Sequence, residues 1–169
     1  EKQNGNYTIT TDNNKSFTVS NLYDASGHHS KFTKYEKNKN IKIRYQTFYG
    51  EILNMNHKYN INECIIMDWS MSHDDPYPPS FVYILPLDNQ NILVEETILI
   101  SDNKIPIHIV KKRLQSRKKK LNINNAKVIL TEKYNLPMGG SLPTKNKGIT
   151  PIGGAAHMVH PSTGYMFGY

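Results

Sequence analysis

The chain has little cysteine and no long apolar run. Its only cysteine, Cys64, excludes an intrachain disulfide framework and any multi-cysteine zinc or iron–sulfur site. We expect this thiol to be buried in the core. No uninterrupted apolar run approaches the ~18 residues of a membrane-spanning helix, and no charged and then apolar leader follows Glu1 that would indicate secretion. The first residue is not methionine, which fits a piece cut from a longer polypeptide.

Acidic residues are fewer than basic ones, and the imbalance sits in one place. The 169 residues include 21 Lys and Arg against 14 Asp and Glu, which gives a formal charge of +7. Residues 111–120, KKRLQSRKKK, carry seven positive charges and no negative charge, so the rest of the chain is neutral overall. This distribution argues against a protein whose whole surface is built for nucleic acid.

The basic segment follows an apolar pattern that is typical of an amphipathic helix. Ile107, Val110 and Leu114 recur at helical spacing, and Pro106 suits the first helical position. These features predict a surface helix over residues 106–120 with a basic outer face. The cations of that face either are simply solvated or attract an anionic membrane surface. Nucleic acid fits less well, because no aromatic residues are interleaved for base stacking.

Short alternating or β-branched segments, separated by turn residues, predict a mostly antiparallel sheet of about four or five strands. Asp12-Asn13-Asn14 and Asp88-Asn89-Gln90-Asn91 each separate two such segments and indicate hairpins. The predicted strand segments are residues 7–11, 16–20, 21–27, 41–53, 64–69, 81–87, 92–100 and 126–130. With one helix packed against this sheet, the sequence predicts an α+β fold.

Two neighbouring glutamates, Glu95 and Glu96, interrupt the apolar run Leu93-Val94-Glu95-Glu96-Thr97. Adjacent residues of a strand face opposite sides, so one carboxylate points to each face of the sheet and at least one should meet an apolar environment. Burial there disfavours the charged form and raises the pKa, which suits a carboxylic acid that delivers a proton. The alternative is an edge strand on which both glutamates are solvated, or one is paired with a lysine.

Asp68 and the only tryptophan, Trp69, follow the apolar segment Cys64-Ile65-Ile66-Met67. They either line a pocket or mark a strand end at which Asp68 accepts hydrogen bonds. The nearby His73, Asp74 and Asp75 are of the residue types that bind metals, but nothing else supplies the spacing of a metal site. We therefore predict no metal.

From Pro137 onward the chain is rich in glycine and proline, and its most informative part is Ile152-Gly153-Gly154-Ala155-Ala156. Small residues let the backbone approach a bulky ligand closely. Pro161 and Ser162 could open a helix whose N–H groups point back at that ligand. A strand–glycine–helix join of this sort suits a dinucleotide, and a glycine-rich loop without a ligand is the alternative. No G-x-G-x-x-G follows a strand, so this chain cannot build a whole dinucleotide-binding domain alone.

Seven short segments, in order along the chain, resemble the lycopene cyclase family, the plant and cyanobacterial type of FAD-dependent carotenoid cyclase. Together they cover about residues 22–166. The segments are Asp24-Ala25-Ser26-Gly27, Gln46-Thr47-Phe48-Tyr49-Gly50, Met67-Asp68-Trp69, Phe81-Val82-Tyr83, Leu93-Val94-Glu95-Glu96-Thr97, Pro137-Met138-Gly139-Gly140-Ser141-Leu142-Pro143, and Gly153-Gly154-Ala155-Ala156 through His160-Pro161-Ser162-Thr163-Gly164-Tyr165-Met166. His157 stands where the family usually has Gly, and there the sequence is similar to a turn of the flavoprotein monooxygenases.

The resemblance implies how the chain is organised. Residues 1–32 and 137–169 would be parts of a Rossmann-like FAD-binding domain of the flavoprotein monooxygenase/reductase type. Residues 33–136, with the helix over 106–120, would form an antiparallel substrate-binding sheet. The family's N-terminal dinucleotide-binding half would precede Glu1, so we expect the isolated chain to be unable to hold FAD and to be inactive.

The resemblance also implies an activity. The family closes the linear ends of lycopene into ionone rings without net redox change, and it needs reduced FAD, with NADPH as the electron source. A terminal alkene is a feeble base, so it needs a strong acid held away from water. Glu95 matches the family's catalytic glutamate and would be that acid, with Glu96 as its backup. Asp68 would stabilise the carbocation or take the proton.

The other site residues follow from the same resemblance. The cofactor-binding candidates are Asp24, Gly27, Gly153, Gly154, Ala155, Ala156 and Met158, and the substrate-binding candidates are Tyr49, Trp69, Tyr83, His160 and Tyr165. The partners would be a carotenoid and, through peripheral contact, a plastid or bacterial membrane in which that substrate dissolves; no nucleic acid is expected. The alternatives are another FAD-dependent monooxygenase or an isoprenoid reductase of the same fold, and a non-catalytic lipid-binding module.

Overall fold

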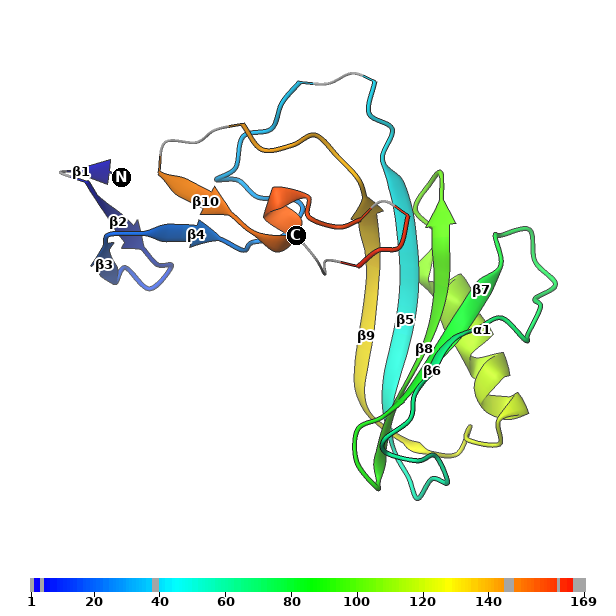
Figure 1. The fold of residues 1–169 in the computed structure, drawn as a ribbon. Helices are drawn as coiled ribbons and strands as arrows, with labels where there is room; N and C mark the ends of the chain where they lie inside the picture. Colours follow the sequence, from blue (N-terminus) through cyan, green and yellow to red (C-terminus); the bar gives the residue numbers. More distant parts are fainter. Residues whose placement is uncertain (1, 4, 38–39, 145–147, 161, 166–169) are drawn as a thin grey trace. The chain divides into compact units, whose positions relative to one another are not determined.

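The computed structural model describes residues 2–3, 5–37, 40–144, 148–160 and 162–165 (Figure 1). Pro161 and Met166 of the segments named above lie outside these residues. The chain forms two compact units: Glu1–Lys42 with Gly139–Tyr169, which we call the split unit, and Ile43–Met138, which we call the sheet unit. The described residues are mostly sheet with one α-helix, a small α+β fold as predicted. None of their helices is long and apolar enough to cross a membrane.

Five antiparallel strands build the sheet unit, in the order β6-β7-β8-β5-β9. The strands are β5 (Arg44–Asn54), β6 (Ile65–Asp68), β7 (Ser80–Pro86), β8 (Asn91–Ser101) and β9 (Lys127–Met138). The predicted hairpin between β7 and β8 is confirmed, because the Asp88 carboxylate accepts the N–H groups of Gln90 and Asn91 and so closes the turn. The strand number agrees with the prediction.

The last strand, β9, differs from the prediction of a short strand over residues 126–130. It continues to Met138 and pairs with β5 along its whole length, Pro137 included. A proline can occupy this position because β9 is an edge strand and has only one neighbour that needs its N–H groups. Polar residues such as Glu132, Lys133 and Asn135 hide this strand from a search for apolar alternation.

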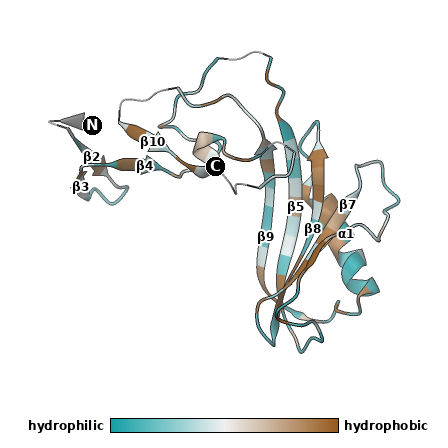
Figure 2. Cartoon of the chain, in the orientation of Figure 1, coloured by the Kyte–Doolittle hydropathy of each residue, from teal (hydrophilic) through white to brown (hydrophobic). Residues whose placement is uncertain are grey.

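One helix, α1 (Ile107–Lys120), packs against β5 and β8 and covers one face of the sheet (Figure 1). We call this the helix face, and the opposite side the open face. The core beneath α1 is aliphatic and includes Leu53, Val82, Ile84, Ile92, Val94, Ile98, Val110 and Leu114. Figure 2 shows the second half of α1 as largely hydrophilic, in agreement with its basic sequence.

The prediction that the basic residues of α1 form an outer face is wrong for three of them. Arg113, Arg117 and Lys118 are buried against the sheet. Each is paired with a carboxylate beneath the helix: Arg113 with Asp75, Arg117 with Glu96 at 3.0 Å, and Lys118 with Glu51 at 2.6 Å. The long aliphatic stems of these side chains cover apolar surface while their charged ends reach the carboxylates. The remaining lysines of the basic segment, at positions 111, 112, 119 and 120, are exposed.

The prediction of a buried Cys64 is also wrong, because the thiol is exposed. Cys64 lies in the loop before β6, a four-residue edge strand. An apolar run at such an edge does not need to be covered, and Ile66 and Trp69 of the same segment are also exposed.

The split unit contains two smaller sheets. β1 (Lys2–Gln3), β2 (Asn6–Thr10) and β3 (Ser16–Val19) form an antiparallel sheet, which confirms the predicted hairpin between residues 7–11 and 16–20. β4 (Leu22–Asp24) pairs in parallel with β10 (Ile149–Pro151), which the sequence did not predict because three residues carry no periodicity. A short 3₁₀ helix, Gly153–Ala156, follows β10.

The buried pair of Arg117 and Glu96 leads to a stability prediction. Arg117→Met leaves the Glu96 carboxylate without its cation in a dry site, so the unfolding free energy of the sheet unit should fall by about 3–5 kcal/mol. Urea unfolding can be followed by the fluorescence of Trp69, which lies in this unit. The control Lys119→Met, at an exposed position of the same helix, should change stability by about 0.5 kcal/mol or less. Equal losses in the two variants would contradict a buried ion pair.

Candidate functional site

Strand β8 places Glu95 and Glu96 on opposite faces of the sheet. Glu96 pairs in register with Tyr49 and Val82 on the helix face, whereas Glu95 pairs with Gly50 and Tyr83 on the open face. The prediction that one carboxylate points to each face is therefore confirmed. The two glutamates have different surroundings, and these surroundings separate the roles that they can take.

Glu96 is fully buried in a polar cluster beneath α1. Arg117 donates from Nε to Oε2 at 3.0 Å and from Nη2 to Oε1 at 3.1 Å. Ser80 donates its hydroxyl to Oε1 at 2.6 Å, and His73 Nε2 lies 3.3 Å from the same oxygen. Burial lowers the pKa of His73 even though the Glu96 charge acts to raise it. With both oxygens occupied by protein partners, Glu96 is arranged to hold the helix on the sheet.

Asp68 lies on the helix face as well, at the end of β6. It pairs in register with Val82, and its Oδ2 is 3.8 Å from Nη1 of Arg117. A hydrogen bond from the Ser70 N–H, with the nearby charges of Arg117 and Lys120, lowers the pKa of Asp68 although partial burial acts to raise it. Met67, before it, has a positive φ of 54° at an irregularity of the β6–β7 pairing. The structure thus brings Asp68 together with Glu96 and not with Glu95.

Glu95 is partly buried on the open face. Its Oε1 accepts the Thr97 hydroxyl at 2.9 Å. A Cβ placed on Gly50 would lie 3.3 Å from the Glu95 Cβ and 3.4 Å from its Oε2, so the side chain lies over the space that this glycine leaves. Burial raises the pKa of the Glu95 carboxyl; the Thr97 hydrogen bond opposes this effect, and the charge of Glu132 adds to it. The net direction is upward, toward a protonated acid.

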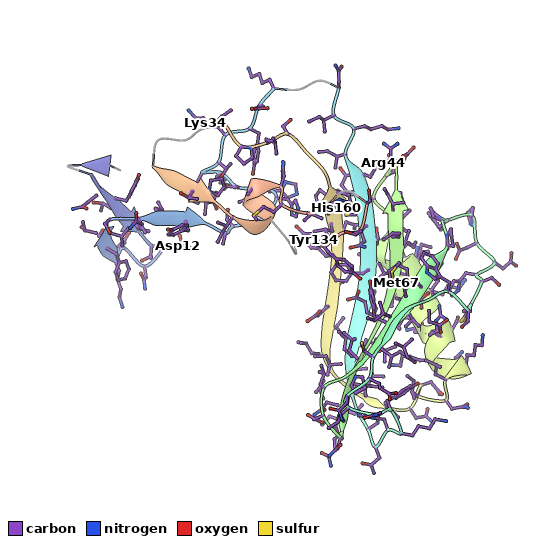
Figure 3. The ribbon with its side chains drawn as sticks, viewed as in Figure 1. Asp12, Lys34, Arg44, Met67, Tyr134 and His160 are labelled. Carbon is purple, nitrogen blue, oxygen red and sulfur yellow. The ribbon has the colours of Figure 1, made fainter. Side chains whose placement is uncertain are left out.

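Aromatic side chains lie on the same open face as Glu95. The Phe81 ring lies 4.8 Å from that of Trp69 and 4.9 Å from that of Tyr83, between ring centroids. On the other side of Glu95, Tyr134 of β9 is partly exposed and pairs in register with Phe48 of β5 (Figure 3). Of the predicted substrate-binding residues, Trp69 and Tyr83 therefore share a face with Glu95.

Tyr49 does not share this face. It is buried under α1, its hydroxyl lies 3.4 Å from the Glu51 carboxylate, and Lys111 Nζ lies 5.7 Å from the centre of its ring. Conversely, the sequence analysis missed Glu132, which pairs in register with Gly50 from the other side of β5 and so shares a face with Glu95. Only the register of β9 against β5 reveals this, and no local signal in the sequence specifies that register.

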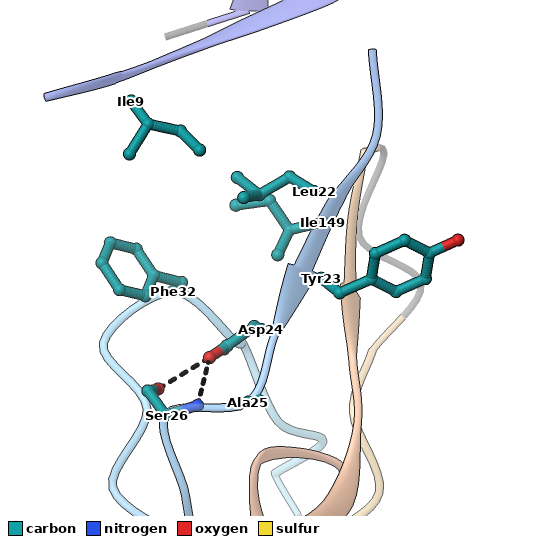
Figure 4. Close-up of a pocket in the computed structure, with 8 residues that line it drawn as sticks. All are labelled: Ile9, Leu22, Tyr23, Asp24, Ala25, Ser26, Phe32 and Ile149. Atoms are coloured by element: carbon teal, nitrogen blue, oxygen red, sulfur yellow. Dashed lines mark hydrogen bonds between the residues drawn. The ribbon is translucent and has the colours of Figure 1, made fainter. Parts of the chain in front are cut away.

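In the split unit, Asp24 ends β4 and organises the loop that follows. Its Oδ1 accepts the Ser26 N–H at 3.0 Å and the Ser26 hydroxyl at 2.6 Å, and its Oδ2 accepts the hydroxyls of Thr33, at 2.6 Å, and Ser30 (Figure 4). Burial would raise the pKa of Asp24, but these hydrogen bonds outweigh it and hold that pKa well below its usual range. The carboxylate is ionised, and both of its oxygens accept hydrogen bonds from residues of the following loop.

The predicted glycine-rich cofactor segment lies beside that loop. Gly154 is packed so closely that a Cβ there would meet His28 at 2.8 Å and the Gly27 Cα at 3.1 Å. Met158 contacts the start of the segment, where its sulfur accepts the Gly153 N–H at 3.2 Å. Ala155 is buried, and its carbonyl accepts the Tyr35 hydroxyl at 2.9 Å. These contacts hold the segment at the carboxyl ends of β4 and β10.

His157 follows in the left-handed conformation, with φ of 52°. Its ring stacks on Tyr35 at 4.5 Å between centroids, and its Nδ1 lies 2.7 Å from the Ser141 carbonyl oxygen. A Cβ on Gly140 would clash with the same ring. His157 thus ties the segment after Met138 to the 3₁₀ helix.

A dinucleotide cofactor fits three features of this region. Ligands of open α/β sheets bind at the carboxyl ends of parallel strands, where Gly27 and Gly153 lie here. A Cβ placed on Gly27 would meet no heavy atom within 4 Å. Nε2 of His28 is buried and has no hydrogen-bond partner among the described residues. The region can therefore form one side of a flavin site.

The last described residues form a turn. The His160 N–H donates to the Tyr165 carbonyl at 2.9 Å, and the Gly164 N–H donates to the His160 carbonyl at 2.9 Å. The prediction of a helix opening at Ser162 is wrong for residues 162–165, because Ser162 and Thr163 occupy this turn. His160 and Tyr165 come together there.

An apolar hollow of about 240 Å³ also lies in the split unit (Figure 4). It is bounded by Ile9 of β2, Leu22 of β4, Ile149 of β10 and the exposed ring of Phe32. Because Asp24 is turned to its own loop, the hollow offers an apolar surface rather than a polar binding site.

Comparison with known proteins gives consistent matches over the chain. A family model described as "Lycopene cyclase protein" matches residues 1–169. A chloroplastic neoxanthin synthase of Solanum tuberosum is 37% identical over 168 residues, which cover 94% of this chain and 33% of that protein. A chromoplastic capsanthin/capsorubin synthase of Citrus sinensis is 34% identical, with the same shares covered. A chloroplastic lycopene beta cyclase of Arabidopsis thaliana is 32% identical over 174 residues, 97% of this chain and 34% of that protein. The chain thus spans about one third of the length of these relatives.

The loop held by Asp24 gives a prediction for the split unit. Asp24→Asn removes the charge that four donors share, so the opening free energy of residues 24–33 should fall by about 2 kcal/mol, or roughly 30-fold in amide hydrogen exchange. Because the folded-state pKa is depressed, the wild-type protection is present at neutral pH and is lost as pH falls below about 4. The variant should lack this dependence once intrinsic exchange is corrected for. Asp12→Asn, in the exposed turn before β3, is the matched control and should exchange as wild type; equal exchange in both variants would refute the role of Asp24.

Proposed function

Because this chain belongs to the lycopene cyclase family, we propose that it is part of a carotenoid cyclase in which Glu95 protonates the linear end of lycopene. The observation that carries this proposal is the partly buried Glu95 carboxyl, with its raised pKa, on a sheet face lined by aromatic rings. Relatives named lycopene beta cyclase support a carotenoid as the substrate. Relatives named as chloroplastic or chromoplastic support a plastid location.

The chemistry requires an acid of this kind. A trisubstituted alkene is a poor proton acceptor, so the donor must be neutral before the reaction and kept from water. The Thr97 hydroxyl holds one oxygen of Glu95, which leaves Oε2 over the space at Gly50. Because Gly50 has no side chain, the Glu95 carboxyl can lie close over the β5 backbone.

The reaction balances as an isomerisation. The Glu95 O–H bond breaks as a new C–H bond forms at the terminal alkene, and this leaves a tertiary carbocation. The neighbouring double bond attacks the cation and closes the ring. A ring proton then passes to a base, and the electrons of its C–H bond form the final double bond. Proton exchange afterwards restores the Glu95 acid and the base, so no oxidant or reductant is consumed. The rings of Trp69 and Tyr83, which are not fully buried, can stabilise the cation through their π faces, and the buried Phe81 ring packs against both of them.

FAD is the proposed cofactor, with NADPH as its electron source. The residues that would hold it are Gly27, Gly153, Gly154, Ala155, Ala156 and Met158, with Asp24 fixing the loop that contains Gly27. When bound in its reduced, anionic form, the flavin supplies negative charge that stabilises a carbocation. We further propose that the other two thirds of such a protein complete this site and that the isolated chain is inactive.

The catalytic prediction concerns Glu95→Gln in the longest natural polypeptide that contains this chain. Ring formation should fall by roughly 10²–10⁴-fold, because the amide cannot deliver a proton. The measurement is the conversion of lycopene to cyclic products in lycopene-accumulating bacteria, followed by chromatography. Glu63→Gln makes the same chemical change at an exposed loop position of the sheet unit and should leave conversion as in wild type. Undiminished ring formation by Glu95→Gln would refute the assignment.

The stability of Glu95→Gln at two pH values tests whether this variant folds. Since the folded-state pKa of Glu95 is raised, its protonation favours the folded state, and its charge costs stability as pH rises through that pKa. Glu95→Gln should therefore be more stable than wild type at pH 8 and indistinguishable from it near pH 3.5. Loss of activity in a variant of higher stability at pH 8 separates a catalytic role from a structural one.

A membrane contact is proposed because the substrate is dissolved in lipid. The exposed lysines of α1, Lys111, Lys112, Lys119 and Lys120, are the candidates, since each basic group near an anionic surface contributes about 1 kcal/mol. Replacing these four by Gln should weaken binding to vesicles with anionic lipid by about 10²–10³-fold in flotation assays. The matched control replaces the exposed Lys15, Lys31, Lys34 and Lys37 of the split unit by Gln. Equal effects of the two sets would mean that α1 is not the contact.

A further inference from the structure

The proposed reaction needs a base as well as an acid, and the structure changes which residue can be that base. Asp68, the candidate from the sequence, lies on the helix face near Arg117. We propose that Glu132 of β9 is the catalytic base that removes the ring proton. This inference rests on the proposed function of Glu95.

Gly50 lies between the two glutamates in the sheet. In β5, Gly50 pairs in register with Glu95 of β8 and with Glu132 of β9. Residues paired in this way point to the same face. The backbones of Glu95 and Glu132 are therefore two strand spacings apart, about 9–10 Å. Because Gly50 has no side chain, no side chain of β5 separates the two glutamates at this position, and the Glu95 side chain lies over Gly50.

The two carboxyl groups have environments suited to opposite roles. Glu95 is partly buried, and the titratable side chains on the same face of the neighbouring strands are Tyr83 of β7 and Glu132 and Tyr134 of β9. Glu132 is exposed on the edge strand, where water can solvate its charge. The negative charge of Glu132 also helps to keep Glu95 protonated, because it adds to the effect of burial on the Glu95 pKa. Two carboxyl groups in unlike environments are a recurrent way of assigning acid and base.

The steps balance with these two groups alone. Glu95 transfers its proton to the terminal alkene carbon, and the ring closes on the resulting cation. A C–H bond next to the cationic carbon then breaks, its electrons form the ring double bond, and the proton passes to a Glu132 oxygen. After the product leaves, Glu132 releases its proton to solvent and Glu95 takes up a proton, so both groups regain their starting states. Because the base selects which C–H bond breaks, Glu132 also determines which ring isomer forms.

The test is Glu132→Gln in the longest natural polypeptide that contains this chain. We expect kcat to fall roughly 10–10³-fold with little change in KM, and the ratio of ring double-bond isomers to change, because a proton is then lost to water from another carbon. Glu132→Asp should restore part of the rate and the wild-type isomer ratio. Glu63→Gln is the matched control and should change neither value. Wild-type kcat together with the wild-type isomer ratio in Glu132→Gln would overturn the proposal.

A second measurement does not depend on activity. In the 169-residue chain, the titration of Glu95 is followed by the infrared band of its carboxyl group, identified by its loss in Glu95→Gln. Glu132→Gln should lower the pKa of Glu95, because a neighbouring negative charge is removed. An unchanged titration would refute the proximity of the two carboxyl groups. If instead the wild-type protein forms no rings while this titration does shift, the proposed function fails and the pairing of Glu95 with Glu132 stands.

Discussion

The ion pair between Glu96 and Arg117 determines what the neighbouring residue can do. Strand side chains alternate, so a shift of β8 by one position would place Glu95 beneath α1 and Glu96 on the open face. Only Glu96 has partners there: Arg117 and Ser80 satisfy its oxygens, and His73 lies beside them. A slipped register would leave Arg117 buried against an apolar strand without its carboxylate, which is costly. The buried pair thus selects the register that presents Glu95 to the open face.

The same principle explains how a strongly basic helix belongs to a sheet core. Three of its cations are neutralised by carboxylates from the sheet unit, Glu51, Asp75 and Glu96. Buried ion pairs contribute less to stability than apolar contacts of the same size, but they specify one arrangement. Here they set the position of α1 along the strands, while Val110 and Leu114 supply the apolar contact. The basic segment is therefore divided into three buried cations that pair with carboxylates and four lysines that are exposed to solvent.

Each unit contributes a distinct part of the proposed chemistry. The sheet unit provides an acid, a second carboxyl group and aromatic rings on one continuous surface. The split unit provides small residues at the ends of β4 and β10 and a loop that Asp24 holds in place through four hydrogen bonds. The proposed reacting groups, Glu95 and Glu132, lie on strands of the sheet unit. Side chains on strands are held more firmly than side chains on loops.

Local sequence determined much of this protein. The hairpins, the helix bounds to within one residue, the mostly antiparallel sheet and the opposite directions of Glu95 and Glu96 follow from periodicity and turn chemistry, which act over a few residues. Other properties depend on pairings between distant segments. Arg117 is buried against Glu96, 21 positions away, and β4 pairs in parallel with β10, 127 positions away. The separation of Asp68 from Glu95, and the position of Glu132 opposite Glu95 across Gly50, depend on strand register. Only the tertiary structure decides these, because a side chain's partners come from whichever strand or helix packs beside it, and no short segment encodes that neighbour.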